Sequence, residues 1–216
     1  MGIWKREGAA LLLLCTVAVA AQADPSAQEL WGQSLEAETG NDIAQALKIH
    51  EQLLPMVGKS YAAYLREGWL LYRSGNYKKA LGYYEKASGI SSGAISPLYG
   101  AMNCHVAMDS ASKAMRSAKA ILVIDELNYT ANLQLAALYY QDRKFSLSAS
   151  YYRKLNRLYP EDLAVTSGLA WSYLEQGQAR KAEPLFKQIL MVSPDYAYAE
   201  QGLETCKSFY SRSRRR

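Results

Sequence analysis

The chain has 216 residues, of which 50% are hydrophobic and 21% are charged, a balance typical of a globular protein with one or two domains. This composition excludes a disordered protein, and three cysteines are too few for a small disulfide-stabilised fold. The formal net charge of +5 raises the question of an anionic partner, such as nucleic acid or an acidic membrane. The answer depends on where the charges lie along the chain.

Residues 1–23 have the order of a secretory signal peptide. Two basic residues precede the apolar run of residues 9–21, and a small-x-small sequence, Ala-Gln-Ala, ends at Ala23. The run has 13 residues, whereas a membrane-spanning helix needs about 20. We therefore expect cleavage after Ala23 and export of the remaining chain. Its destination is the periplasm in a Gram-negative bacterium, or the secretory lumen or extracellular space in a eukaryote.

A 34-residue period runs through the chain from Ala27 to Tyr196. It divides this segment into the blocks 27–60, 61–94, 95–128, 129–162 and 163–196. Positions 17, 20, 24 and 27 of a block are spaced three and four apart and are largely apolar, which predicts one face of an α-helix. Positions 4, 7, 8 and 11 predict a preceding helix in the same way, and turn-forming residues separate the two in most blocks. Each block is therefore predicted to be a helical hairpin that must stack on its neighbours to bury its apolar face.

The pattern within the blocks resembles the tetratricopeptide repeat. The block at 163 carries its signature residues as Leu169, Ala170, Tyr173, Ala182, Phe186, Ile189 and Pro194. The blocks at 61 and 129 match well, whereas those at 27 and 95 are degenerate and are supported mainly by being in phase. The resemblance implies an all-α, right-handed α-solenoid. We expect residues 197–210 to form a capping helix and residues 211–216 to form a disordered basic tail.

The sequence contains no recognisable catalytic motif. His50 and His105 fall at core positions of the period, and neither has a cysteine or carboxylate at metal-ligand spacing. Cys104 and Cys206 occupy the same position three blocks apart, which is too far for a disulfide within the chain, so we expect free thiols or an intermolecular pair. We predict a protein that is not an enzyme, with no metal site and no cofactor.

The resemblance implies that a partner binds the concave surface of the solenoid. In this family that surface is lined by positions 2, 5, 9, 12 and 13 of the first helix of each hairpin. The candidate binding residues at these positions are Trp31, Trp69, Tyr72, Arg73, Tyr99, Asn103, Tyr140 and Trp171. Their aromatic rings either pack between helices or form a groove for a peptide or a glycan. The carboxylate clamp of chaperone-binding members is not carried over, because only Asn103 matches it.

These features predict a non-enzymatic, protein-binding scaffold in the periplasm that serves the assembly or secretion of cell-envelope components. The alternative is a glycan-binding module that acts in polysaccharide export or on peptidoglycan. Both functions use the aromatic residues of the concave surface. The sequence leaves the identity of the partner and the oligomeric state open.

The excess positive charge lies at the chain ends. Between residues 24 and 211 the chain has 19 Lys and Arg against 19 Asp and Glu. The C-terminus then adds a run of arginines, which are Arg212, Arg214, Arg215 and Arg216. The body of the chain is thus neutral in sum, which argues against a nucleic-acid partner. The arginine tail is either a solubilising end or a weak attachment to anionic lipid.

Overall fold

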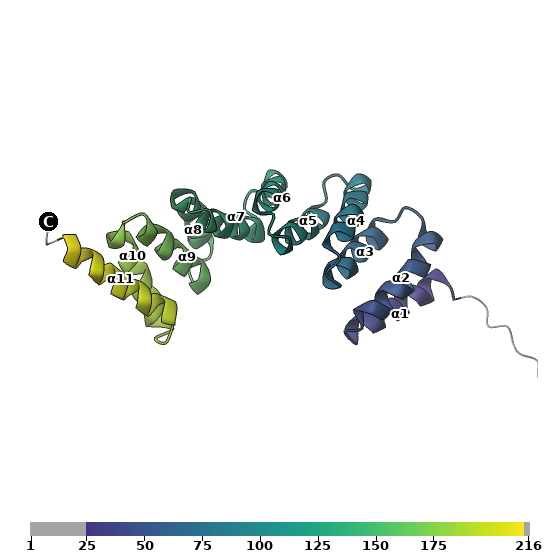
Figure 1. The fold of residues 1–216 in the computed structure, drawn as a ribbon, viewed down its shortest axis with the longest axis horizontal. Helices are drawn as coiled ribbons and strands as arrows, with labels where there is room; N and C mark the ends of the chain where they lie inside the picture. The colour runs from purple at the N-terminus through teal and green to yellow at the C-terminus, as the bar shows by residue number, and fades with distance from the viewer. Residues whose placement is uncertain (1–24, 214–216) are drawn as a thin grey trace, which may run out of the picture.

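The computed structural model describes residues 25–213, which form eleven α-helices (Figure 1). They are α1 (Ala27–Thr39), α2 (Ile43–Val57), α3 (Tyr61–Arg73), α4 (Tyr77–Ile90), α5 (Ile95–Ala107), α6 (Ala111–Ile124), α7 (Tyr129–Gln141), α8 (Phe145–Leu158), α9 (Leu163–Glu175), α10 (Ala179–Val192) and α11 (Ala197–Ser213). The predicted signal peptide and Arg214, Arg215 and Arg216 lie outside the described residues.

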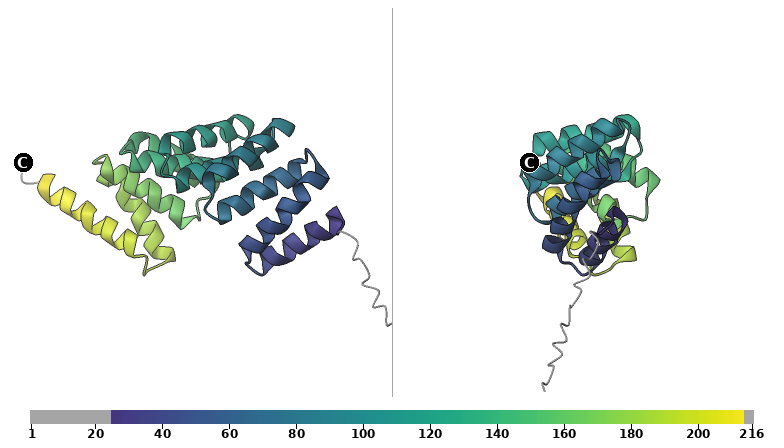
Figure 2. Two further views of the ribbon diagram at one scale, coloured as in Figure 1. Left: turned by 45° about the vertical axis from the view of Figure 1, so that its right-hand side comes forward. Right: turned by 90° about the vertical axis from the view of Figure 1, so that its right-hand side faces the viewer.

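The helices pack as sequential hairpins that stack into a curved row (Figures 1 and 2). Each helix contacts the next along the chain, and α3 also contacts α5, as α9 contacts both α7 and α11. In Figure 1, α4 and α6 lie at the outer edge of the row, with α3 and α5 on its inner side. The predicted all-α fold of stacked hairpins is confirmed.

The starts of the odd-numbered helices follow the period in the sequence. They begin at residues 27, 61, 95, 129, 163 and 197, which are 34 residues apart. Side-chain caps explain several of these starts: the Ser26 hydroxyl accepts from the Glu29 N–H while the Glu29 carboxylate accepts from the Ser26 N–H, and Asp162 accepts from the N–H groups of Ala164 and Val165. Such caps satisfy backbone donors that the helix leaves unpaired.

The turn inside each hairpin uses one left-handed residue at the same position of the period. Position 15 of the five blocks has a positive φ in every case: Asn41 (60°), Gly75 (82°), Asp109 (52°), Arg143 (56°) and Gly177 (73°). Glycine, asparagine and aspartate tolerate this conformation, and they mark the turn in the sequence. Arg143 gives no such signal, so the turn of the fourth hairpin depends on the helices that flank it.

The core is a row of small clusters rather than one central mass, because each hairpin buries its apolar face against its neighbours. Position 20 is fully buried in each hairpin. The residues there are Ala46, Ala80, Ala114, Ser148 and Ala182. Small side chains at this position let the two helix backbones come close together.

The last helix covers the apolar end of the row. In α11, Ala199 and Cys206 are buried with Phe186 and Ile189 of α10. This helix continues to Ser213, so it includes the first residues of the segment that was expected to be a disordered tail. Within residues 25–213, every helix is too short or too polar to cross a membrane.

Candidate functional site

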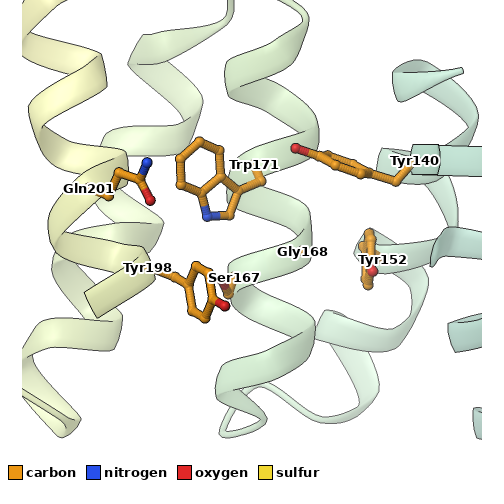
Figure 3. A pocket seen from close by; sticks show the side chains of 7 residues that line it. All are labelled: Tyr140, Tyr152, Ser167, Gly168, Trp171, Tyr198 and Gln201. Carbon is orange, nitrogen blue, oxygen red and sulfur yellow. The ribbon is translucent and has the colours of Figure 1, made fainter. Parts of the chain in front are cut away.

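A pocket of about 370 Å³ opens where α7, α8, α9 and α11 meet (Figure 3). The residues that line it are Tyr140, Tyr152, Ser167, Gly168, Trp171, Tyr198 and Gln201. Two of the predicted binding residues, Tyr140 and Trp171, therefore belong to one site. Figure 3 shows the Trp171 indole between Tyr140 on one side and Gln201 on the other.

Core contacts hold the two predicted aromatic residues of this pocket in place. Trp171 is half-buried and meets Phe186 edge to face, with ring centroids 5.4 Å apart. Tyr140 is also half-buried and meets Phe145 in the same way at 5.3 Å. Edge-to-face contacts of this kind stabilise a defined ring orientation. The pocket is thus largely preformed, which lowers the entropic cost of binding.

The floor of the pocket depends on a close contact between a tyrosine and a glycine. The buried Tyr152 ring of α8 lies against the backbone of Gly168 in α9, in the space that a Cβ atom on residue 168 would occupy. The same arrangement joins Tyr84 to Gly100 and Phe186 to Gly202. In each pair the aromatic residue is at position 24 of one block and the glycine is at position 6 of the next.

The pocket is polar at its edges but carries no formal charge. None of its seven lining residues is a lysine, an arginine or an acid. Burial, with a further effect of the nearby Glu175 carboxylate, raises the pKa of Tyr140, and burial raises the pKa of Tyr152. Both hydroxyls therefore stay protonated at neutral pH and can donate hydrogen bonds. This chemistry suits an apolar or planar group with hydrogen-bonding atoms, and it offers no counter-charge to a carboxylate.

The predicted residues of α1 and α3 lie apart from this pocket and contact other side chains of the chain. The Trp31 ring lies 5.8 Å from the His50 ring, and the Arg66 guanidinium lies 5.8 Å from the centre of the Trp31 ring. Arg73 lies over the Trp69 ring at 5.0 Å and donates a hydrogen bond to Asn41 Oδ1 at 2.8 Å. These contacts are structural, within and between the first two hairpins.

Tyr72, Tyr99 and Asn103 also lie outside the pocket. Tyr72 packs against Tyr77 with ring centroids 5.6 Å apart. The Tyr99 hydroxyl donates to Asn128 Oδ1 at 2.6 Å, which joins the start of α5 to the start of α7. The Asn103 side chain is exposed. Of the predicted binding residues, therefore, only those of α7 and α9 meet in one pocket.

Sequence reasoning missed three polar or exposed residues of the site. Ser167 and Gln201 are at position 5 of their helices, and Tyr198 is at position 2 of α11. These are positions that the family resemblance assigns to the concave surface. Continuing the 34-residue numbering beyond residue 196 into the last helix would have identified Tyr198 and Gln201.

The two histidines lie in different surroundings, and of the two only His50 has a hydrogen-bond partner within the described residues. His50 Nδ1 lies 2.8 Å from Glu67 Oε2, and the side chains are 0% and 4% exposed. Burial, followed by the positive charges of Lys113 and Arg116, lowers the pKa of His105. In the part of the chain that the structure describes, no three His, Cys, Asp or Glu residues come together as metal ligands would. Cys104 and Cys206 are buried free thiols in different clusters.

Comparison with protein families identifies one matching segment of the chain. Residues 32–95 match the family model described as "Tetratricopeptide repeat". The matched segment therefore resembles tetratricopeptide repeats. A search of curated proteins finds no match. Tetratricopeptide repeat proteins are generally protein-binding scaffolds and are typically not enzymes.

Several solved structures share the tetratricopeptide fold of this chain at low sequence identity. A tetratricopeptide repeat protein from Parabacteroides merdae is 17% identical and has a TM-score of 0.74; the match covers 88% of this chain and 75% of that one. YrrB, described as a TPR protein with an unusual peptide-binding site, is 16% identical with a TM-score of 0.68 and coverages of 83% and 92%. MamA from Desulfovibrio magneticus is 14% identical with a TM-score of 0.70 and coverages of 79% and 96%. At these identities the likeness establishes the fold alone.

Proposed function

We propose that this chain is an exported, non-enzymatic scaffold that binds a peptide segment of a partner protein in the pocket between α7, α9 and α11. The observation that carries the proposal is the aromatic pocket itself, in which Tyr140, Trp171 and Tyr198 come from three successive inner helices. A peptide-binding site described for the structurally similar YrrB supports this choice. The N-terminal sequence supports export to the periplasm and a role in assembling or secreting envelope components.

The chemistry of the pocket defines the peptide that it should bind. Trp and Tyr provide large, rigid contact surfaces with a hydrogen-bonding tip, and such residues contribute about 2 kcal/mol or more when they form a binding hot spot. The ligand side chain entering the pocket should be apolar or aromatic, with backbone groups bonding to Gln201 or the tyrosine hydroxyls. A C-terminal carboxylate should be disfavoured, because the lining residues include no cation.

Selection from a random peptide display library tests this site. Tyr198 is 66% exposed, so the Tyr198→Ala/Gln201→Ala variant should fold normally while losing at least tenfold in affinity for selected peptides. Phe209→Ala is the matched control, because Phe209 is an exposed aromatic residue of the same helix that does not line the pocket. Equal binding by the two variants, or selection of no peptide by the wild-type chain, would reject the pocket as a peptide site.

A glycan ligand is the second candidate, because a sugar ring can stack on an exposed aromatic ring while Ser167 and Gln201 bond its hydroxyls. Binding of defined envelope glycans should then change the fluorescence of Trp171. Trp171→Phe should remove that change while Trp69→Phe, whose tryptophan lies outside the pocket, should keep it. If no glycan changes the tryptophan fluorescence, the glycan candidate is rejected and the peptide is the remaining candidate ligand.

Export has its own test. Expression of the full chain in a Gram-negative host, followed by periplasmic extraction and N-terminal sequencing, should yield a protein that begins at Asp24. A protein that keeps residues 1–23 and stays in the cytoplasm would contradict the proposed localisation without affecting the pocket.

A further inference from the structure

The fold sorts the charges of the chain onto different helices, although their sum is near zero. The outer helices α6 and α8 contain six Lys and Arg residues and no Asp or Glu. The inner helices α5, α7 and α9 contain no Lys or Arg, and their one acid is Glu175. A chain with balanced charge therefore has a locally cationic outer surface over its third and fourth hairpins.

The cations of α6 and α8 are spaced so that they share the outward side of each helix. Arg116 and Lys119 are three residues apart on α6, and Arg153 and Arg157 are four apart on α8, so each pair lies on one helix face. All four side chains belong to exposed residues. The nearest acids in sequence follow the two helices: Asp125 and Glu126 come after α6, and Glu161 and Asp162 come after α8. Glu126 pairs with Lys154 at 2.8 Å, and Asp162 accepts from the Tyr129 hydroxyl at 2.6 Å. Neither of these contacts neutralises the four outward cations.

Exposed aliphatic side chains lie beside these cations. Val123 at the end of α6 is 87% exposed, Leu127 in the following turn is 53% exposed, and Leu158 at the end of α8 is 44% exposed. Leu127 and Leu158 line a shallow cavity of about 360 Å³ together with Ser150, Arg153, Lys154 and Arg157. The cavity thus offers apolar walls and cationic hydrogen-bond donors at one place.

We propose that this outer surface, defined by Arg116, Lys119, Arg153, Arg157, Val123, Leu127 and Leu158, binds the surface of an anionic phospholipid membrane. Arginine donates paired hydrogen bonds to phosphate, and aliphatic side chains next to such cations enter the interfacial layer of the bilayer. A site for single-stranded nucleic acid would use stacking aromatic residues among the cations, and this set contains none. A duplex would contact the cations through its phosphates but would not bury the aliphatic residues. Anionic headgroups attract the cations, and the interfacial layer of the bilayer buries the aliphatic residues, so a lipid interface uses both features of this surface.

This proposal is independent of the pocket, because its residues lie on α6, α8 and the turn between α6 and α7, and none of them lines the pocket. A membrane-bound chain would keep its inner helices, and hence the pocket, directed away from the lipid. Failure of one proposal therefore leaves the other untouched.

Sedimentation with vesicles tests the surface. The full chain should bind vesicles of phosphatidylcholine with 30 mol% phosphatidylglycerol and should bind pure phosphatidylcholine much more weakly. Since each cation near an anionic surface contributes roughly fivefold in affinity, Arg153→Glu/Arg157→Glu should weaken binding by about 25-fold or more. Lys78→Glu/Lys79→Glu is the matched control, because it makes the same charge change on α4, away from the aliphatic residues. Circular dichroism checks that both variants fold.

Two further variants separate the parts of the surface. Charge attraction is screened at 0.5 M salt, so the vesicle binding that the wild type keeps there should come from the aliphatic residues. Val123→Ser/Leu127→Ser should lose this salt-resistant binding. Replacing Arg214, Arg215 and Arg216 by serine should leave most binding in place, because the proposed contact lies on α6 and α8. Every variant shares the N-terminal apolar run with the wild type, so differences between variants report on the substituted surface.

Three results would overturn the proposal. Equal losses of vesicle binding in the α8 variant and the α4 control would show that binding depends on the net charge of the chain and not on this surface. Full loss on replacing the terminal arginines would assign the binding to the tail. Binding to poly-L-glutamate with no binding to anionic vesicles would replace the membrane by an acidic protein segment.

Discussion

The Tyr152 ring of α8 occupies the place that a side chain on Gly168 of α9 would fill. The contact joins two hairpins and also forms the floor of the pocket. The positions equivalent to Tyr152 and Gly168 in the preceding pair of blocks are Ala118 and Gln134. In both pairs, therefore, one of the two facing positions has a small residue and the other has a larger one. The size of each residue in such a pair is therefore explained by its partner in the neighbouring block.

Substitution of Gly168 tests this packing. Gly168→Ala should lower the free energy of unfolding by about 1–2 kcal/mol, because the cost of overpacking exceeds the gain in helix propensity of about 1 kcal/mol. Gly82 is an exposed helical glycine with no atom within 4 Å of an added Cβ, so Gly82→Ala should instead raise stability by about 0.5–1 kcal/mol. Urea unfolding followed by circular dichroism measures both. Equal effects of the two substitutions would show that the Tyr152 ring moves aside without cost.

The buried His50–Glu67 pair joins α2 to α3 and should be sensitive to the loss of one partner. His50→Leu leaves the Glu67 carboxylate buried without its partner and should cost about 3–5 kcal/mol. His50→Leu/Glu67→Leu removes both polar groups and should recover most of that loss. Lys187→Ala breaks the more exposed Glu183–Lys187 pair and should cost less than about 1 kcal/mol. A double variant as unstable as the sum of its two single variants would contradict the coupling of this pair.

Arg143 is the only arginine among the five left-handed turn residues, and this conformation costs a side-chain-bearing residue about 1 kcal/mol. Arg143→Gly should therefore raise the thermal midpoint, with a gain in stability of about 0.5–1 kcal/mol. Gly75→Ala at the equivalent turn should lower it by a similar amount. Destabilisation by Arg143→Gly would indicate that the arginine side chain contributes more to the turn than its backbone conformation costs.

The thiols of Cys104 and Cys206 should be unreactive in the native chain. Burial raises the pKa of Cys104 to about 11, and burial together with the Glu183 charge raises that of Cys206. Because the thiolate is the reactive form and both pKa values lie above the ordinary range, both groups stay protonated at pH 8. Iodoacetamide labelling with peptide mass spectrometry should find both sites unmodified until guanidinium is added. Native labelling as fast as that of a cysteine-containing peptide would contradict their burial.

The period in the sequence was sufficient to predict the helices and their order. Helix starts at residues 61, 129 and 163 follow from local chemistry: an apolar face of period 3.6, turn residues between the helices, and caps such as Asp162. The turn at Arg143 had no local signal, because its conformation depends on the helices that it joins. The sequence also predicted that Tyr140 and Trp171 would share the inner surface, since the family pattern assigns their positions to it.

Only the tertiary structure decided which of these residues form a site and where the charge is displayed. A pocket forms at Trp171 because α11 brings Tyr198 and Gln201 against α9, whereas Trp31 and Trp69 have cationic and aromatic neighbours of their own. The sum of charges over residues 24–211 is zero in the sequence, yet the fold places Arg116 on α6 and Arg153 and Arg157 on α8, both of which are outer helices. The net charge of a sequence does not say where the charged residues lie in space. Residues of different hairpins come close together only when the apolar faces between the hairpins are buried.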